Sequence, residues 1–400
     1  MTQTPADVTI LGAGPVGIAL ALQLARLTRH PERIVLCKPA RASAVGNDSG
    51  QQQAIDPRVM ALNHGSRVLL ESLGAWPSGG ADILDIHVSQ RGRLGRTHIS
   101  HTDFDVRALG TVLSYATLSD TLDAALARSG ITVRSGASAR LVSQDEAGAV
   151  IEQDGESWTT SVCVQAEGGT FDQQSRKDMH RPYDQEAVLA TVRAERPRPG
   201  WAWERFTPEG PLALLPYPPH AGASQGDLYA LVWCCSPARA QVLRGLNDAD
   251  FSRELNEAFG TRLGELAVVG TRHAYPLGIN LRKTTVDQRC VAIGNAAQTL
   301  HPVAGQGLNL GLRDAARLAQ TLAQLLNQPS LDPRPLLAEY ARARRADRWL
   351  TAGLTDFMPR IFTTGWSVIE HACGLALLSL DVSHRLRRPL ARQLMEGRRS

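Results

Sequence analysis

The pattern of apolar positions predicts strands that are each followed by a helix. Apolar runs of strand length cover residues 7–11 and 290–293, and each ends at a glycine, Gly12 or Gly294. A third such run covers residues 33–37. Apolar residues with helical spacing follow the two glycines, at residues 18–25 and 308–322. Alternation of this kind is typical of an α/β protein with a Rossmann-like parallel sheet.

The stretches between these elements are expected to contain both strands and helices. Residues 86–90 read as a strand, residues 118–127 as a helix and residues 131–164 as several strands. Residues 56–73 are expected to form one helix, with Pro57 in its first turn and Gly74 after its end.

The middle of the chain changes character and predicts a β-rich domain inserted into the first. Its expected strands are separated by proline and glycine and lie at residues 187–192, 203–206, 212–215 and 228–234. A helix is expected at residues 248–259. The predicted division is a discontinuous first domain (1–182 and 276–330), a β-rich substrate domain (183–275) and a helical C-terminal segment (331–400).

Composition narrows the class without naming a function. The 400 residues are 43% hydrophobic and 20% charged, with a net charge of +4, which is typical of a globular protein of more than one core. No nucleic-acid motif accompanies the basic residues. The six cysteines lack metal-ligand spacing and are expected to be buried free thiols of a cytoplasmic protein without a signal peptide.

The C-terminal segment leaves two interpretations open. Residues 357–369 are more apolar than a solvent-facing tail requires, so they either complete the core or touch a membrane or partner. The arginines at 385, 387, 388 and 392 would favour peripheral contact with an anionic membrane.

The first glycine motif predicts a dinucleotide site. Gly12-Ala13-Gly14-Pro15-Val16-Gly17 follows a predicted strand and opens a predicted helix, so its backbone N–H groups and the helix dipole favour a pyrophosphate. A carboxylate for the ribose is expected at the end of the next strand, but Lys38 stands there. A lysine has no acceptor for ribose hydroxyl groups.

A second glycine stretch, residues 289–314, predicts a site for a flat ligand. His301-Pro302 prevents helix locally, and Gly305 and Gly307 let backbone N–H groups approach closely. The helix that follows directs its N-terminal dipole at the same place. The alternative is a tightly packed corner of strand, loop and helix.

Separate groups of residues together resemble the class A flavin monooxygenases that hydroxylate aromatic rings, and among them the hydroxylases of ubiquinone biosynthesis. The resemblance runs from about residue 7 to residue 360. It rests on Gly12 to Gly17, Ala166-Glu167-Gly168, residues 294–314, 87–92, 204–207 and 210–213, and Ala274-Tyr275-Pro276-Leu277. Within this family, the sequence is most similar to the branch of hydroxylases that acts on 2-polyprenyl-6-methoxyphenol.

The resemblance implies residue roles around FAD. Gly12, Ala13, Gly14, Pro15 and Gly17 would hold the pyrophosphate, and Lys38 stands in place of the ribose acid. Glu167 replaces the family's aspartate beside the phosphate turn, and Gly294-Asn295 replaces its usual Gly-Asp next to the ribityl chain. Arg58 would contact the flavin, unless it is a surface arginine. Those expected to line the flavin ring are Pro302, Gly305, Gln306, Gly307, Leu308 and Asn309.

The resemblance also implies a reaction. NAD(P)H would act as a transient electron donor and O2 as co-substrate, through a flavin C4a-hydroperoxide, converting 2-polyprenyl-6-methoxyphenol to 2-polyprenyl-6-methoxy-1,4-benzoquinol. His301 either assists deprotonation of the phenol or is structural. The alternatives are a hydroxylase of another ring position, a hydroxylase of a small soluble aromatic compound, and a structural subunit that has lost FAD.

Overall fold

The first sheet has a central strand that is buried on both faces, which requires covering layers on each side. In the computed structural model every residue of β1 (Ala6–Leu11) is buried, and β1 pairs in parallel with β11 (Glu156–Gln165) and β2 (Ile34–Pro39). One face packs against helices and the other against a β-hairpin. The structure describes residues 6–40, 59–168, 174, 177–219, 226–301, 305–362 and 366–396.

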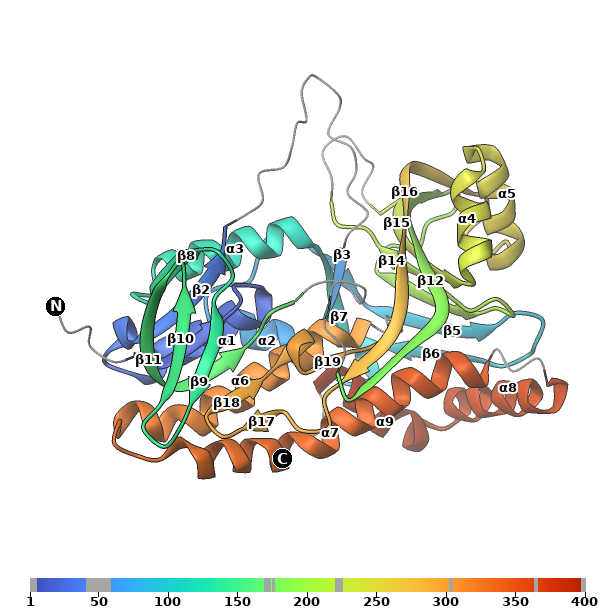
Figure 1. The fold of residues 1–400 in the computed structure, drawn as a ribbon. Coiled ribbons are helices and arrows are strands. Elements are labelled where there is room, and N and C mark those ends of the chain that lie inside the picture. Colours follow the sequence, from blue (N-terminus) through green and yellow to red (C-terminus); the bar gives the residue numbers. More distant parts are fainter. Residues whose placement is uncertain are drawn as a thin grey trace, which may run out of the picture.

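The strand order of this sheet is β17-β18-β11-β1-β2-β8, with β10 paired to β11 and β9 paired to β10. The further strands are β8 (Thr132–Gly136), β9 (Arg140–Gln144), β10 (Ala149–Gln153), β17 (Val286–Asp287) and β18 (Cys290–Ala292). The covering helices are α1 (Pro15–Leu27), α3 (Tyr115–Ala127) and α6 (Gln306–Asn327). This is the predicted Rossmann-like arrangement, and Figure 1 shows it on the left.

The second sheet is mostly antiparallel and has the order β19-β16-β12-β15-β14-β13-β5-β6. The helices α4 (Pro237–Gly245) and α5 (Asp248–Phe259) pack on one of its faces through a buried cluster that includes Trp233 and Phe251. The strands are β5 (Asp85–Gln90), β6 (Arg96–Ser100), β12 (Met179–Ala194), β13 (Trp201–Phe206), β14 (Pro211–Pro216), β15 (Leu228–Cys235), β16 (Leu266–Leu281) and β19 (Gln298–Thr299).

A small third sheet corrects one prediction. The expected single helix over residues 56–73 is wrong, because β3 (Val59–Asn63) pairs with β7 (Gly110–Ser114), which also pairs with β4 (Ala81–Ile83). The helix α2 (His64–Ser72) begins only after Asn63, whose side chain accepts a hydrogen bond from the Ser66 N–H. Tertiary pairing therefore overrode helical spacing in the first half of this stretch.

Three helices complete the chain and lie along one side of both sheets (Figure 1). They are α7 (Pro333–Ile361), α8 (Ser367–Val382) and α9 (His384–Glu396). The helix α7 packs on α6, α8 packs on β5 and β6, and α9 contacts α2 and β3. The predicted helical C-terminal segment is thus joined to both sheets.

The predicted domain boundaries stay a prediction, although the second sheet extends beyond them. Its strand β12 begins at Met179, β16 continues to Leu281, and β5 and β6 come from residues 85–100. The cysteines Cys37, Cys163, Cys234, Cys235, Cys290 and Cys373 are all buried and free, as predicted. Among the described residues, no helix is both long and apolar enough to cross a membrane.

Candidate functional site

Two of the glycines in the first motif are required by packing. Gly12 adopts φ +109°, and a Cβ atom built on it would lie 2.8 Å from the backbone of Ala166 and Glu167. A Cβ atom on Gly17 would lie 2.0 Å from the carbonyl oxygen of Gly12. These glycines let β1, the end of β11 and the start of α1 approach one another. Ala13 packs against the same core.

Gly14 differs from these, because a Cβ atom built on it meets no described atom within 4 Å. Gly14 is the N-cap of α1, and Pro15 occupies the first turn, where its missing N–H costs nothing. The end of α1 therefore presents open space and unpaired N–H groups, which suits a diphosphate. The residues present fit this part of a dinucleotide.

The second motif lies directly beside the first. Gly294 begins η4 (Gly294–Ala296) with φ +56°, and its Cβ position is 3.2 Å from the side chain of Val16 on α1. Gly311 on α6 has its Cβ position 2.7 Å from the same valine. Close packing at these glycines places the turn that contains Asn295 beside α1, and the role of Asn295 next to FAD stays a prediction.

The N-terminus of α6 is the predicted wall of the flavin ring. Gly305 is its N-cap in the left-handed region at φ +59°, and its Cβ position is 3.3 Å from that of Ala61. A Cβ atom on Gly307 would meet no described atom within 4 Å. Gln306 is buried and Leu308 packs partly into the first core. The open side at Gly307 and the helix dipole fit an electron-rich flat group.

Asn309 has a structural task that the motif alone did not reveal. Its Oδ1 accepts hydrogen bonds from the Asn63 N–H at 2.9 Å and the Ser66 hydroxyl at 2.7 Å. Its Nδ2 donates to the carbonyl oxygens of Ala61 at 2.9 Å and Gly305 at 2.8 Å. The side chain therefore ties β3 and α2 to the flavin wall, and both of its polar atoms are used within the protein.

Glu167 and Gly168 follow the C-terminal end of β11, beside the first motif. Ala166 N–H donates to the carbonyl oxygen of Leu11 at 2.8 Å, which holds this turn against β1. Glu167 is exposed, although partial burial of its carboxyl group raises the pKa. Its role near the phosphates stays a prediction.

Lys38 at the end of β2 is neutralised by a residue that sequence spacing could not identify. Its Nζ lies 2.7 Å from Oδ1 of Asp123 on α3, and both side chains are about one-third exposed. The position expected for the ribose acid therefore carries an ion pair, with the carboxylate supplied from another element. A cofactor-binding role for Lys38 stays a prediction.

His301 is buried behind the glycine turn, and burial lowers the pKa of its imidazole to about 4. Its ring centroid is 5.3 Å from that of Tyr183. A group with so low a pKa is a poor proton acceptor at neutral pH, which favours the structural alternative. Arg58 and Pro302 lie outside the described residues.

A buried ionic network behind the site was missed by sequence reasoning. Asp314 Oδ2 accepts from the Gly294 N–H at 3.3 Å and Gln298 Nε2 at 2.6 Å, while Oδ1 accepts from Arg344 Nε at 2.8 Å. Arg348 Nε donates to Gln298 Oε1 at 2.6 Å. The sequence signal was the run of arginines on α7, which had no assigned partners.

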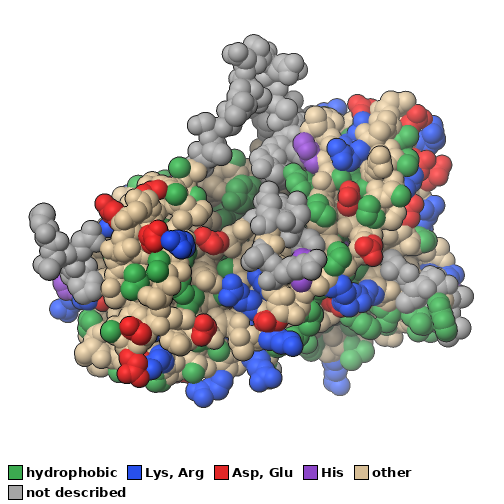
Figure 2. Space-filling view, in the orientation of Figure 1, with side chains coloured by type: hydrophobic (Ala, Val, Ile, Leu, Met, Phe, Trp, Pro, Cys, Tyr) green, Lys and Arg blue, Asp and Glu red, His purple; other side chains and the backbone are tan. Residues whose placement is uncertain are grey.

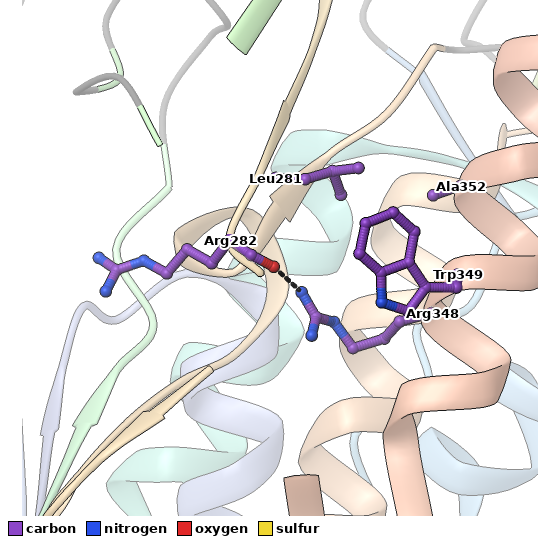
Figure 3. A pocket seen from close by; sticks show the side chains of 5 residues that line it. All are labelled: Leu281, Arg282, Arg348, Trp349 and Ala352. Carbon is purple, nitrogen blue, oxygen red and sulfur yellow. Dashed lines mark hydrogen bonds between the residues drawn. The ribbon is translucent and has the colours of Figure 1, made fainter. Parts of the chain in front are cut away.

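Figure 3 shows the outer end of this network, where Arg348 Nη2 donates to the carbonyl oxygen of Arg282 at 3.1 Å. The cavity beside it is lined by Leu281, Arg282, Arg348, Trp349 and Ala352. Its volume of about 10 Å³ has room for about one water molecule. It is therefore part of the α7 contact rather than a ligand site.

Comparison with known proteins decides the family. Residues 5–352 match the protein family described as FAD binding domain. The chain is 32% identical to ubiquinone hydroxylase UbiL of Rhodospirillum rubrum, covering 98% of this chain and 89% of the relative. This chain belongs to the FAD-dependent aromatic hydroxylases. Its predicted cofactor, FAD, is confirmed, and so is its predicted class of monooxygenase.

Two further comparisons agree with the family and the fold. The chain is 28% identical to 3-demethoxyubiquinol 3-hydroxylase of Escherichia coli, covering 97% of this chain and 98% of the relative. The fold matches the crystal structure of p-nitrophenol 4-monooxygenase PnpA from Pseudomonas putida with a TM-score of 0.70 at 16% identity, over 100% of both chains. The expected Rossmann-like domain, second sheet and helical C-terminus are thus confirmed as one known architecture.

Gly307→Ala tests whether the open side of the α6 N-terminus receives FAD. We expect the substitution to leave the melting temperature of the FAD-free protein nearly unchanged but to weaken FAD binding about tenfold, because the new methyl group occupies the ligand's space. The measurement is fluorescence titration with FAD. The matched control is Gly353→Ala on α7, another glycine with open space, which should not change FAD affinity. Equal affinities for both variants would favour the packing-corner interpretation.

Exchanging the two charges at Lys38 and Asp123 tests the ribose position. The double variant Lys38→Glu/Asp123→Lys keeps an ion pair and places a carboxylate where a ribose hydroxyl group can donate to it, so FAD should bind several-fold more tightly. Lys38→Glu alone should lower the melting temperature, because it faces Asp123 at short distance. Weaker FAD binding by the double variant would show that Lys38 itself contacts the cofactor.

Proposed function

We propose that this protein hydroxylates the aromatic ring of a polyprenylated phenol in ubiquinone biosynthesis, converting 2-polyprenyl-6-methoxyphenol to 2-polyprenyl-6-methoxy-1,4-benzoquinol. One oxygen atom of O2 enters the ring, the other leaves as water, and NAD(P)H supplies two electrons. Two open helix N-termini, those of α1 and α6, lie near the inner face of the second sheet, which is the face opposite α4 and α5. This arrangement is the observation that carries the proposal. The names of the relatives support the pathway.

When bound, FAD supplies the redox chemistry and the activation of O2. The chain's own task is to orient the ring and exclude water. The inner face of the second sheet contributes apolar groups for this, because Ala202 and Leu215 belong to a cluster with Ala61, which touches Gly305. That cluster joins the predicted flavin wall to the predicted substrate domain.

A second candidate is hydroxylation of another ring position of a ubiquinone precursor. It is supported by the Escherichia coli relative, which is named for hydroxylation of 3-demethoxyubiquinol. The stretch Glu204-Arg205-Phe206-Thr207 with Gly210-Pro211-Leu212-Ala213 supports the methoxyphenol substrate instead, since it resembles that branch.

The reaction is tested with FAD-loaded protein, NADH or NADPH, and short-tailed forms of both substrates under 18O2. We expect the methoxyphenol to gain one labelled oxygen atom at the ring position para to its hydroxyl group, as measured by mass spectrometry and NMR. Labelling of the demethoxyubiquinol alone would establish the second candidate. If NAD(P)H oxidation yields hydrogen peroxide and neither substrate is labelled, both are excluded.

We propose further that α8 and α9 contact an anionic membrane surface, from which a polyprenylated substrate could enter. Leu375, Val382 and Leu386 are 65%, 77% and 57% exposed, and Arg385 and Arg388 beside them are exposed. Figure 2 shows hydrophobic side chains along the lower right edge, where Figure 1 places α8. Exposed apolar groups flanked by arginine match the chemistry of an anionic lipid surface.

The segment proposed for this contact divides between surface and core. Phe357 and Trp366 are exposed, whereas Phe362 is buried and stacks on Phe206 with centroids 3.9 Å apart. Arg387 is also buried, and its Nη2 lies 3.0 Å from Asp103 Oδ2. Removal of the whole C-terminus would therefore damage the fold, and single surface positions are the better test.

Arg385→Gln/Arg388→Gln tests the membrane contact. Because each basic residue near an anionic surface adds roughly 1 kcal/mol, binding to vesicles containing anionic lipid should weaken at least tenfold in a co-sedimentation assay. The control Val242→Gln changes an exposed residue of α4, on the far face of the second sheet, and should not affect binding. Unchanged binding by the double variant would contradict the proposal.

A further inference from the structure

The inner face of the second sheet carries a carboxyl group that the cofactor site does not use. Side chains alternate between the faces of a strand. On β13, Trp203 lies 6.0 Å from Phe259 of α5, and Arg205 Nε donates to the carbonyl oxygen of Ala258 of α5 at 3.2 Å. Both therefore face α5. Glu204, between them, faces the opposite side.

The neighbours of Glu204 on its own strand confirm which side this is. Ala202 belongs to the apolar cluster that includes Met395 of α9 and contacts Ala61 near the flavin wall. Phe206 stacks on Phe362 of the C-terminal helices. Glu204 thus lies between two apolar clusters on the face turned toward the predicted flavin ring.

The cross-strand neighbours of Glu204 are small or medium apolar residues. Glu204 is opposite Val88 of β5 on one side and Ala213 of β14 on the other. Ala213 in turn is opposite Val232. Glu204, Ala213 and Val232 are all partly exposed, although the clusters on either side are packed. The carboxyl group of Glu204 therefore has apolar neighbours on a face that stays partly accessible, where an apolar ring with one polar group could contact it.

Glu204 has no counter-ion among the described residues. Its carboxyl group makes no hydrogen bond or ion pair with any of them, and desolvation by its apolar neighbours raises its pKa to about 7. Among the described residues, strand register also places Cys234 of β15 and Tyr275 and His273 of β16 on this face, and Cys373 belongs to the cluster around Phe206. Burial and then the charge of Glu204 raise the pKa of Cys234, so this thiol stays neutral. A carboxyl group with a pKa near neutral and no assigned partner can accept a proton from a bound ligand.

We propose that Glu204 receives the hydroxyl group of a neutral phenol and accepts its proton, so that the protein selects phenols without a carboxylate. This rests on the proposed hydroxylase function. The O–H bond of the phenol breaks, the proton moves to Glu204 Oε, and the electron pair remains on the phenolate oxygen. The ring carbons ortho and para to that oxygen gain electron density, which is what attack by an electrophilic oxygen requires. The proton returns to the product oxygen afterwards.

The same geometry explains the substrate class. An anionic aromatic acid would bring a second negative charge to an apolar face on which no described residue compensates the charge of Glu204. A neutral phenol instead donates a hydrogen bond to the carboxylate, and hydrogen bonds to charged groups are stronger than those between neutral groups. A decarboxylated phenol therefore fits this face, and a hydroxybenzoate does not.

The test compares Glu204→Gln with wild type, using FAD-loaded protein and two probes, a short-tailed 2-alkyl-6-methoxyphenol and its methyl ether. Binding is followed by the change in flavin absorbance. Wild type should prefer the phenol at pH 8 by at least tenfold, and the preference should decline below pH 7 as Glu204 takes up a proton. Glu204→Gln should bind both probes alike at every pH, and its turnover of the phenol should fall about 100-fold, a usual contribution of a positioned base.

Two controls separate this role from a structural one. Glu186→Gln changes a partly buried carboxyl group of β12 that belongs to the other face, and it should behave as wild type. The folded pKa of Glu204 lies above its ordinary value of 4.5, so its ionisation between about pH 4.5 and 7 lowers stability as the pH rises. Glu204→Gln should therefore melt at the same or a higher temperature at pH 8. If Glu204→Gln melts at a lower temperature and binds the phenol and the ether equally more weakly than wild type, Glu204 has a structural role and the proposal is overturned.

Its failure can be distinguished from failure of the proposed function. If wild type hydroxylates the phenol but binds phenol and ether alike, the role of Glu204 is wrong and the function stands. If wild type prefers the phenol through Glu204 but forms no labelled product, the proton acceptor stands and the hydroxylase function is wrong. If wild type binds neither probe, both are overturned.

Discussion

The carboxylate of Asp314 joins the parts of the molecule that would hold the flavin. It is completely buried, and its two oxygen atoms reach the turn at Gly294, the side chain of Gln298 and the guanidinium of Arg344. Removing one partner from a buried ion pair typically costs 3–5 kcal/mol, since the other charge is left uncompensated. The turn at Gly294 touches Val16 of α1, so a shift there would also move the first glycine motif.

This constraint makes the C-terminal helices part of the cofactor site. Burial disfavours the charged guanidinium of Arg344, but Asp314 and Asp347 outweigh that effect and raise its pKa. Asp347 also lies 3.3 Å from Arg313 and accepts from Gln393 of α9 at 2.9 Å. A segment that sequence reasoning separated as residues 331–400 is thus connected through hydrogen bonds to a turn near residue 294. The C-terminal helices therefore have two roles. Their buried side holds the turn at Gly294 through Arg344 and Asp347, and their exposed side carries the apolar residues and arginines described above.

Local chemistry could be predicted from the sequence, whereas pairing between distant elements could not. The glycines at 12, 14 and 17 stand between a predicted strand and a predicted helix, so the turn could be recognised within the motif itself. By contrast, β13 pairs in parallel with β5, which lies more than 100 residues earlier in the chain. The spacing of apolar residues within either strand does not indicate which strand it will pair with. The same limit explains the incorrect helix over residues 56–73, where pairing with β7 decided the structure. It also explains why Lys38 read as a defect, since its partner Asp123 lies 85 residues away.

The charges around the site divide into two kinds with opposite tasks. On the cofactor side, the N-termini of α1 and α6 supply positive potential that is fixed by the backbone and independent of pH. On the proposed substrate side, Glu204 has a pKa raised to about 7 by desolvation, so its charge changes near neutral pH. Burial lowers the pKa of His301 to about 4, which makes it a poor proton acceptor and favours the structural role that its position before Pro302 had suggested. A phenol between these two sides could give its proton to Glu204, while the helix N-termini stabilise negative charge on the flavin. Neither the helices nor the sheet would have to move during this proton transfer, because both charges are already in place.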